Sequence, residues 1–185
     1  MRRPLLACLA VLLGACGSDR TRVKSDWETQ NETRLAMEAA AEVVPELPPY
    51  PRPENLIEFF VSSASEFKFF IDRASLGVKD GVVRYTLVAR SPSGADNVSY
   101  EAMSCAAGEY RVFALGHSDG TWVSRPGPWR EIPPRSVQRW HNALHREFFC
   151  PNRVAISDAA EGLMALKQGG HPWVKPDTAV GGSAR

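Results

Sequence analysis

The cysteines of this chain are the residues whose positions point most directly to chemistry, and the second of the four closes a signal-like N-terminus. Two arginines precede an apolar run over residues 5–13. That run is too short to span a bilayer of about 30 Å and is typical of an export signal. Leu-Gly-Ala-Cys at 13–16 resembles the bacterial lipobox, so we expect removal of signal peptide 1–15 and acylation of Cys16. The alternative is an ordinary secretory signal cut near Ala15, which leaves Cys16 as a free thiol.

Acylation of Cys16 predicts a permanent membrane anchor. Each acyl methylene buried in lipid contributes about 0.8 kcal/mol, and three chains exceed the two signals needed for stable attachment. In similar lipoproteins an aspartate directly after the cysteine retains the protein in the inner membrane, whereas here that residue is Gly17. We therefore expect the mature chain to be lipid-anchored at the periplasmic face of the bacterial outer membrane.

The two remaining cysteines form an even pair. Cys8 leaves with the signal peptide and Cys16 is acylated, so Cys105 and Cys150 remain in an oxidising compartment. A disulfide between them would close a loop of about 45 residues, for which loop-closure entropy gives about 4 kcal/mol. The alternatives are two separate thiols or a catalytic redox pair, although the Cys-x-x-Cys spacing typical of such pairs is absent.

The histidines suggest metal binding or catalysis only weakly. His141 and His145 stand four residues apart, a spacing that lets two imidazoles bind one metal, with Glu147 nearby. On an amphipathic helix the two histidines would flank the apolar face and Glu147 would point away, so we expect boundary positions and no metal site. His117 precedes Ser-Asp at 118–119, but adjacent residues in a turn do not converge as a catalytic triad does. We expect no catalytic residues and no cofactor.

Composition narrows the class of protein further. The chain has 185 residues, of which 44% are hydrophobic, enough to build the core of one modest domain. Loss of the two signal arginines takes the formal charge from +1 to −1. A near-neutral chain without a basic block lacks the electrostatic footprint of a nucleic-acid-binding protein. The motifs of serine hydrolases, phosphate-binding loops, dinucleotide-binding folds and zinc proteases are also absent.

Three charged residues in the strand-rich part of the chain are candidates for ligand binding. We expect Arg84, Glu101 and Arg111 to share the less apolar face of a sheet. On neighbouring strands they would form cross-strand ion pairs worth about 0.2 to 1 kcal/mol each. The functional alternative is a surface for an anionic ligand, facing peptidoglycan or lipopolysaccharide.

The elements that must position these residues can be predicted from periodicity. Between residues 56 and 130 apolar residues alternate with period two, which predicts five or six half-buried antiparallel strands in a meander. Trp122 and Trp129 flank a proline-rich bend and mark the last edge segment. Residues suited to tight turns separate the runs, at 79–81, 91–94, 107–108 and 119–120.

After two prolines at 133–134 the apolar period becomes helical. We expect one helix over about 135–149, and a second that is capped by Ser157, faces Leu163 and Met164 inward and stops at the glycines 169–170. Strands followed by helices predict an α+β domain in which the two C-terminal helices cover one face of the antiparallel sheet.

The flanking segments differ in composition from the domain. We expect a tether over 16–54, with a helix from about 26 to 43 and an extended proline-rich spacer over 48–53. The single domain then covers 55–169, and 170–185 is predicted to be a loose C-terminal tail.

Several segments together resemble one known family, the cryptic neisserial protein family of small bacterial periplasmic lipoproteins. The similarity extends from about residue 47 to 168, and Cys105 and Cys150 fall where that family places its two cysteines. The resemblance implies a periplasmic lipoprotein and supplies no activity, cofactor or catalytic residue. The segments that carry it are Leu47-Pro48-Pro49-Tyr50-Pro51, Asp80-Gly81-Val82-Val83-Arg84-Tyr85-Thr86-Leu87-Val88, Asn97-Val98-Ser99-Tyr100-Glu101, Asp119-Gly120-Thr121-Trp122 and Phe149-Cys150-Pro151.

These observations lead to three functional hypotheses. The first is a non-enzymatic binding or scaffolding role in the cell envelope, with an envelope protein or peptidoglycan as partner. The second is binding of an anionic envelope glycan or lipid headgroup by the charged sheet face. The third is an enzyme of a class whose motif is not recognisable.

Acylation requires the sulfur of Cys16, so Cys16→Ser should abolish incorporation of radiolabelled palmitate and block the normal signal cleavage. Cys8→Ser is the matched control, because it removes a thiol from the signal peptide itself and should leave labelling unchanged. Labelling of the Cys16→Ser protein at the wild-type level would contradict the anchor.

Overall fold

The computed structural model describes residues 25, 27, 45–133 and 140–174. The chain divides into two compact units, 1–40 and 41–185, and every element described below belongs to the second. The predicted acylation site Cys16, the helix predicted over 26–43 apart from Trp27, and the end of the chain from residue 175 lie outside the described residues.

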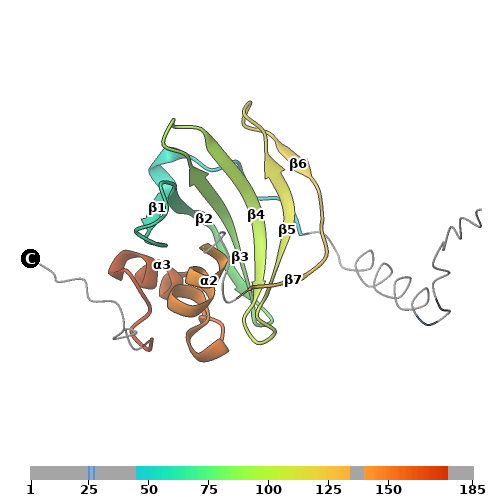
Figure 1. The fold of residues 1–185 in the computed structure, drawn as a ribbon, viewed down its shortest axis with the longest axis vertical. Helices are drawn as coiled ribbons and strands as arrows, with labels where there is room; N and C mark the ends of the chain where they lie inside the picture. Colours follow the sequence, from blue (N-terminus) through green and yellow to red (C-terminus); the bar gives the residue numbers. More distant parts are fainter. Residues whose placement is uncertain (1–24, 26, 28–44, 134–139, 175–185) are drawn as a thin grey trace, which may run out of the picture. The chain divides into compact units, whose positions relative to one another are not determined.

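A single antiparallel sheet forms the centre of this unit (Figure 1). Its path follows the order of the sequence from β1 to β6, which confirms the predicted meander. A short edge strand, β7 (Arg130–Glu131), pairs with β5 beside β6, and a 3-10 turn, η1 (Pro53–Asn55), leads into β1. The six strands of the path are β1 (Leu56–Phe59), β2 (Lys68–Lys79), β3 (Val82–Arg90), β4 (Asp96–Ser104), β5 (Glu109–Gly116) and β6 (Trp122–Ser124).

The turns between the strands follow from residues that tolerate positive φ. Asp80 (φ 53°) and Gly81 (φ 74°) make a two-residue hairpin between β2 and β3, in which Lys79 pairs with Val82. Two successive positive φ values match the right-handed twist of the flanking strands. The other predicted turns are also confirmed, each with a glycine at positive φ, namely Gly94, Gly108 and Gly120.

The C-terminal part is helical, as predicted, but its first helix is irregular. It comprises α2 (Trp140–Ala143) and a π-helical segment, η2 (Leu144–Phe149), in which the amide of Cys150 donates to the carbonyl of His145 at 3.1 Å. A 3-10 turn, η3 (Pro151–Arg153), and α3 (Ala159–Gln168) follow. No helix within the described ranges is both long and apolar enough to cross a membrane.

The cap of α3 differs from the prediction. The N-cap is Asp158, whose Oδ1 accepts from the amide of Glu161 at 2.9 Å, while Ser157 donates from its amide and its Oγ to the Glu161 carboxylate. The inward position predicted for Met164 is also wrong, because that side chain is exposed. Ala165 is one of the residues that face the sheet instead.

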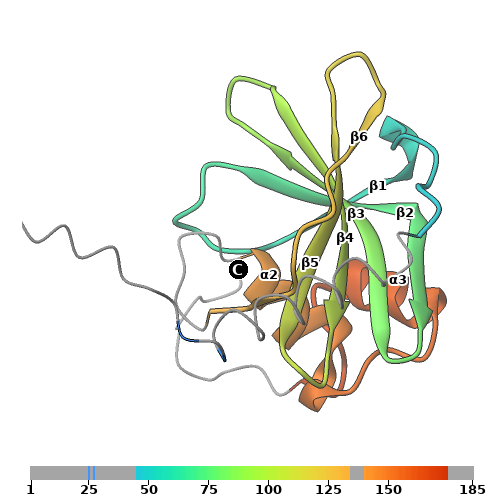
Figure 2. The ribbon, with the colours of Figure 1, turned by 90° about the vertical axis from the view of Figure 1, so that its right-hand side faces the viewer.

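The main core lies between the sheet and the helices. Figures 1 and 2 show the helices gathered over one end of the sheet, with the β3–β4 and β5–β6 hairpins extending beyond them at the other end. Helix α3 approaches β2 so closely that a Cβ on Gly162 would lie 2.6 Å from Ile156 and 3.0 Å from Leu76. The residues that fill this core include Ile71, Val83, Tyr85, Leu87, Met103, Leu144, Phe148, Phe149 and Leu166.

The second face of the sheet is also covered, so the prediction of half-buried strands is wrong for β3 and β4. Val98, Tyr100 and Ala102 on β4 point away from the helices and are nevertheless buried. They belong to two smaller apolar clusters, which include Trp122 from β6 and residues from the segment that precedes β1.

That covering segment, residues 45–52, is called here the N-terminal strap. The indole N–H of Trp122 donates to the carbonyl of Pro48 at 2.9 Å, and the Tyr50 hydroxyl donates to the carbonyl of His117 at 3.0 Å. Tyr50 fits only because Gly116 has no side chain, since a Cβ there would lie 2.8 Å from the Tyr50 oxygen. The strap is therefore packed on the folded domain, whereas residues 48–53 were expected to form an extended spacer outside it.

A disulfide joins the sheet to the helical segment. Cys105 directly follows β4 and Cys150 directly follows η2, and the two sulfurs lie 2.05 Å apart. The structure thus contains the bridge expected from the cysteine count, and both sulfurs are buried in the main core.

Replacing both Cys105 and Cys150 by serine should lower the free energy of unfolding by about 2 to 5 kcal/mol, the usual cost of losing a native bridge in a small exported domain. Circular dichroism should show unchanged secondary structure, because the alternation that builds the strands is intact. The measurement is urea unfolding of the double variant beside the wild type with and without reductant. Equal stability of all three samples would show that the bridge contributes nothing.

Candidate functional site

The structure does not bring the three predicted binding residues together. In the register of the sheet Arg84 pairs with Ala102, and Ala102 pairs with Arg111, so both arginines lie on the face away from the helices. Arg111 is only 2% exposed, and its guanidinium lies 5.2 Å from the ring centre of Phe113. Glu101 is the neighbour of Ala102 on β4 and therefore points to the opposite face. The prediction that these three residues share one charged face is therefore wrong.

Glu101 instead forms a buried pair with His141. The imidazole Nε2 lies 2.8 Å from Glu101 Oε2, and the hydroxyl of Ser99 donates to Oε1 at 2.6 Å. Both side chains are almost fully buried, and the His141 ring stacks on Tyr110 with 3.7 Å between ring centres. The predicted boundary position of His141 is wrong. The signal in the sequence that could have indicated a buried partner for Glu101 was Glu101 itself, because an acid on the core face of a strand requires such a partner.

The surroundings keep the Glu101 carboxylate ionised. Burial alone would raise its pKa, but the charge and hydrogen bond of His141 and the hydrogen bond from Ser99 outweigh burial and lower the pKa. Burial, and then the Glu101 charge, raise the pKa of Tyr85 well above its ordinary value. The pair is closed off from solvent, so its geometry indicates a structural role.

The other two histidines of interest are engaged separately. His145 donates from Nε2 to the carbonyl of Cys105 at 3.1 Å, and burial lowers its pKa. Because a carbonyl only accepts, the proton of the neutral ring lies on Nε2 and Nδ1 is unprotonated. His117 lies in an exposed turn, 3.2 Å from Asp119. Among the residues that the structure describes, no three histidine, cysteine or acidic side chains gather in a manner that could hold a metal.

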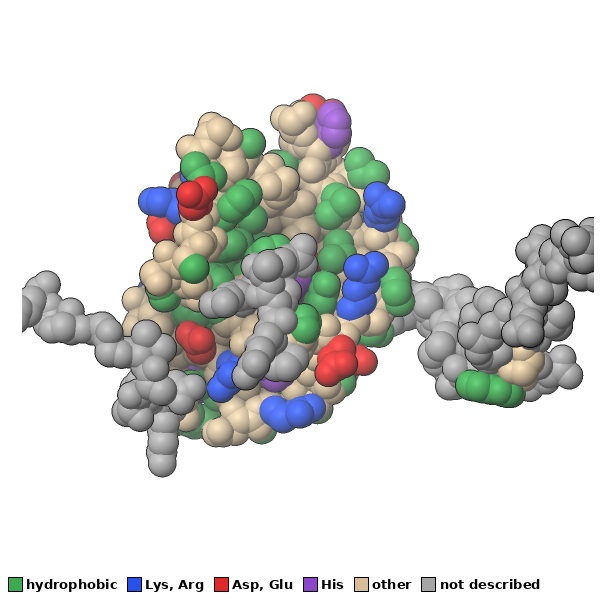
Figure 3. Space-filling view, viewed as in Figure 1, with side chains coloured by type: hydrophobic (Ala, Val, Ile, Leu, Met, Phe, Trp, Pro, Cys, Tyr) green, Lys and Arg blue, Asp and Glu red, His purple; other side chains and the backbone are tan. Residues whose placement is uncertain are grey.

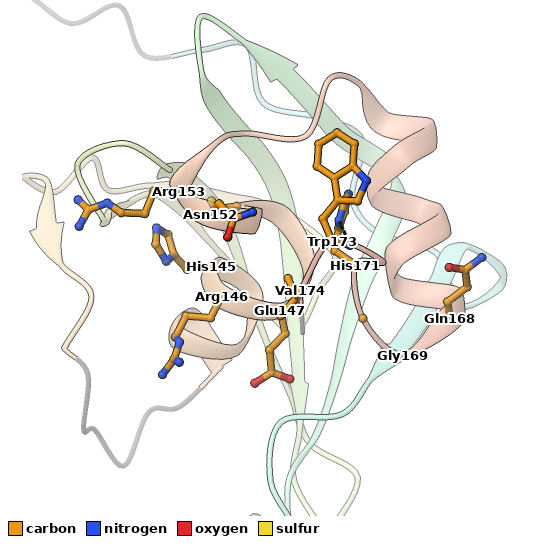
Figure 4. Close-up of a pocket in the computed structure, with 12 residues that line it drawn as sticks. His145, Arg146, Glu147, Asn152, Arg153, Gln168, Gly169, His171, Trp173 and Val174 are labelled. Carbon is orange, nitrogen blue, oxygen red and sulfur yellow. Dashed lines mark hydrogen bonds between the residues drawn. The ribbon is translucent and has the colours of Figure 1, made fainter. Parts of the chain in front are cut away.

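The described surface is hollowed beside the disulfide. An open cleft of about 1030 Å³ lies between η2 and η3 on one side and the end of α3 and residues 171–174 on the other (Figure 4). Its lining is largely polar and includes Cys150 of the bridge. Sequence reasoning missed this cleft, because one of its walls was expected to be a loose tail.

That wall, residues 171–174, is called here the C-terminal turn, and it is held to the domain. The amide of His171 donates to the carbonyl of Glu147 at 2.6 Å. The amide of Trp173 donates to His171 Nδ1 at 3.2 Å, which leaves Nε2 as the protonated nitrogen that donates to Glu161 at 2.9 Å. The prediction of a loose tail is therefore wrong for the C-terminal turn.

The opposite wall of the cleft contains two unusual backbone conformations. Asn152 (φ 54°) and Arg153 (φ 65°) are both left-handed, and neither is glycine. For residues with a Cβ this conformation costs about 1 to 2 kcal/mol each, less for Asn. The guanidinium of Arg153 donates to the carbonyl of Ala106, which ties this wall to the turn after β4.

The electrostatics of the cleft suit a polar ligand. Arg146 and Arg153 contribute two guanidinium groups, and Glu147 contributes a carboxyl group whose pKa is raised by burial. Elsewhere, on the face shown in Figure 3, acidic and basic side chains are interspersed. The cleft therefore combines hydrogen-bond donors and acceptors with an excess of positive charge.

The model of the CNP1-like family matches residues 36–167 of the chain, which confirms the resemblance seen in the strand and cysteine segments. No curated protein and no solved structure matches the chain.

His141→Ala should lower the free energy of unfolding at pH 7 by about 3 to 5 kcal/mol, because Glu101 would remain as a buried charge without its partner. The pKa of Glu101 is lowered in the wild type, so its stabilising contribution exists above the ordinary glutamate pKa and is lost as the pH falls through the lowered value. The difference between variant and wild type should therefore shrink below about pH 4. Urea unfolding at a series of pH values measures it.

His117→Ala is the matched control, since this exposed histidine also lies beside an acid and its loss should cost less than about 1 kcal/mol. A His141→Ala protein as stable as the control at pH 7 would show that the buried pair is dispensable.

Proposed function

The chain belongs to the CNP1-like family, and from this premise we propose that it is an outer-membrane lipoprotein whose periplasmic domain binds a component of the cell envelope without catalysing a reaction. The Leu-Gly-Ala-Cys motif at 13–16 supports the anchor at Cys16. The Cys105–Cys150 disulfide supports an extracytoplasmic location, because such bridges persist in oxidising compartments.

The cleft beside the disulfide is the observation that carries the binding role. Its walls come from segments that are fixed before any ligand arrives: Cys150 by the bridge, Arg153 by the carbonyl of Ala106, and the C-terminal turn by Glu147 and Glu161. A preformed concave site with polar groups in set positions is the usual form of a ligand-binding site. Rigid walls also reduce the conformational entropy lost on binding.

The arrangement of titratable groups supports binding rather than catalysis. His145 and His171 are the imidazoles of the cleft, and each uses its protonated nitrogen to hold the fold, at Cys105 and at Glu161. The Glu101–His141 pair has the chemistry of an acid and a base but is closed off in the core. Ligand binding by the sheet face of Arg84 and Arg111 has less support, since Arg111 is buried.

A benzophenone amino acid placed at Gln168, which lines the cleft, should crosslink to an envelope component in living cells that produce the acylated protein. Benzophenone inserts into C–H bonds, so it captures protein and glycan partners alike. The same amino acid at Glu66, an exposed residue of the β1–β2 loop, is the positional control. A product specific to Gln168, identified by mass spectrometry, is expected, whereas identical patterns from both positions would contradict a binding role for the cleft.

A further inference from the structure

An exposed tryptophan stands in the C-terminal turn of the cleft. The Trp173 side chain is 67% exposed, and Figure 4 shows its indole between α3 on one side and Asn152 and Arg153 on the other. Trp is usually well buried, because transfer of its large apolar rings out of water lowers the free energy. An exposed indole at the wall of a polar cleft therefore offers a flat apolar surface in a place where a ligand would meet it.

This indole contacts a residue that is itself anchored in the domain. The ring of His171 packs edge-on against it, with 5.3 Å between ring centres, and also accepts the hydrogen bond from the Trp173 amide. His171 is buried and donates to Glu161, whose pKa is lowered by the hydrogen bonds from Ser157 and from His171. A chain of contacts thus runs from the first turn of α3 to the exposed ring.

The facing wall presents side chains at a conformational cost. Glycine would adopt the left-handed backbone of residues 152 and 153 freely, whereas Asn152 and Arg153 do so against steric repulsion. Residues kept in such conformations cluster at functional sites, where the surrounding structure enforces them. What the chain gains here is an amide and a guanidinium in the lining of the cleft.

The combination of groups points to a carbohydrate. The C–H groups on one face of a pyranose ring carry partial positive charge and are attracted to the negative face of an aromatic ring. The hydroxyl groups around the edge of the sugar need hydrogen-bond partners, and the amide, imidazole and carboxyl groups that line the cleft can supply them. A guanidinium adds bidentate recognition of a carboxylate or phosphate. An apolar peptide side chain is a less suitable ligand, because the cleft is open and its lining is largely polar.

We infer that the cleft binds an acidic oligosaccharide, with one sugar ring stacked on Trp173 and an anionic substituent farther along the glycan against Arg153. This inference rests on the proposed binding function and names the chemical class of its ligand. Carboxylates of peptidoglycan stems and the acidic groups of a lipopolysaccharide core share this chemistry, so the experiment must distinguish these two sources.

The test is calorimetric titration of the full-length acylated protein in detergent with three probes: a muropeptide, a lipid-free lipopolysaccharide core oligosaccharide, and neutral chitotetraose. At least one acidic probe should bind, and the neutral probe should bind at least about tenfold more weakly. Trp173→Ala should weaken the acidic probe by about tenfold or more, as expected for a central aromatic contact. Trp173→Tyr should restore most of the affinity, because it retains a stacking ring.

Phe60→Ala is the matched control, since Phe60 is also 67% exposed and lies outside the cleft. It should bind the acidic probe as the wild type does. The preferred acidic probe identifies the source of the glycan.

Three results would overturn the inference: binding of neither acidic probe, equal binding of neutral and acidic probes, or unchanged binding by Trp173→Ala. If neither acidic probe binds while Gln168 still crosslinks specifically in cells, the cleft binds a partner that is not an acidic glycan. In that case the inference fails and the proposed function stands.

Discussion

The junction between the end of β4 and the helical segment is the constraint on which the remaining architecture depends. The Cys105–Cys150 disulfide fixes it covalently, and two histidines reinforce it, His141 through Glu101 and His145 through the carbonyl of Cys105. The three links join β4 and the residue directly after it to one short segment, residues 141–150. They hold the helices against the sheet on one side, and on the other they place Cys150 in the lining of the cleft.

Periodicity predicted the elements of the fold well and their burial less well. The alternation of apolar residues and the turn residues such as Asp80 and Gly81 are local signals, and both strand order and hairpins followed from them. The burial of the second sheet face could not be read from the strands. It depends on the N-terminal strap, a proline-rich segment whose contacts with Trp122 and Gly116 are more than 60 residues distant in sequence.

The site was less predictable than the fold, because it too depends on contacts between residues that are distant in sequence. The cysteine pair could be found by counting, because compartment and number alone restrict its chemistry. The pairing of Glu101 with His141 depends on which face of β4 meets α2, and a bulge in the β4–β5 register shifts the two strands relative to each other at Tyr100 and Glu101. Composition predicts a loose tail for the C-terminal turn, because the hydrogen bonds that hold it to the domain come from α3 and η2 and leave no signal in its own sequence.

The strap also determines how mechanical load enters the domain. Tension on the chain from a point before residue 45 reaches the sheet first through Pro48 and Tyr50, which are attached at β6 and at the β5–β6 turn. The pull is therefore taken up at the opposite edge of the sheet from β1, although β1 follows the strap directly in sequence. As long as these contacts hold, the edge formed by β1 and the helices packed beside it stay unloaded while the chain is pulled from its N-terminal side.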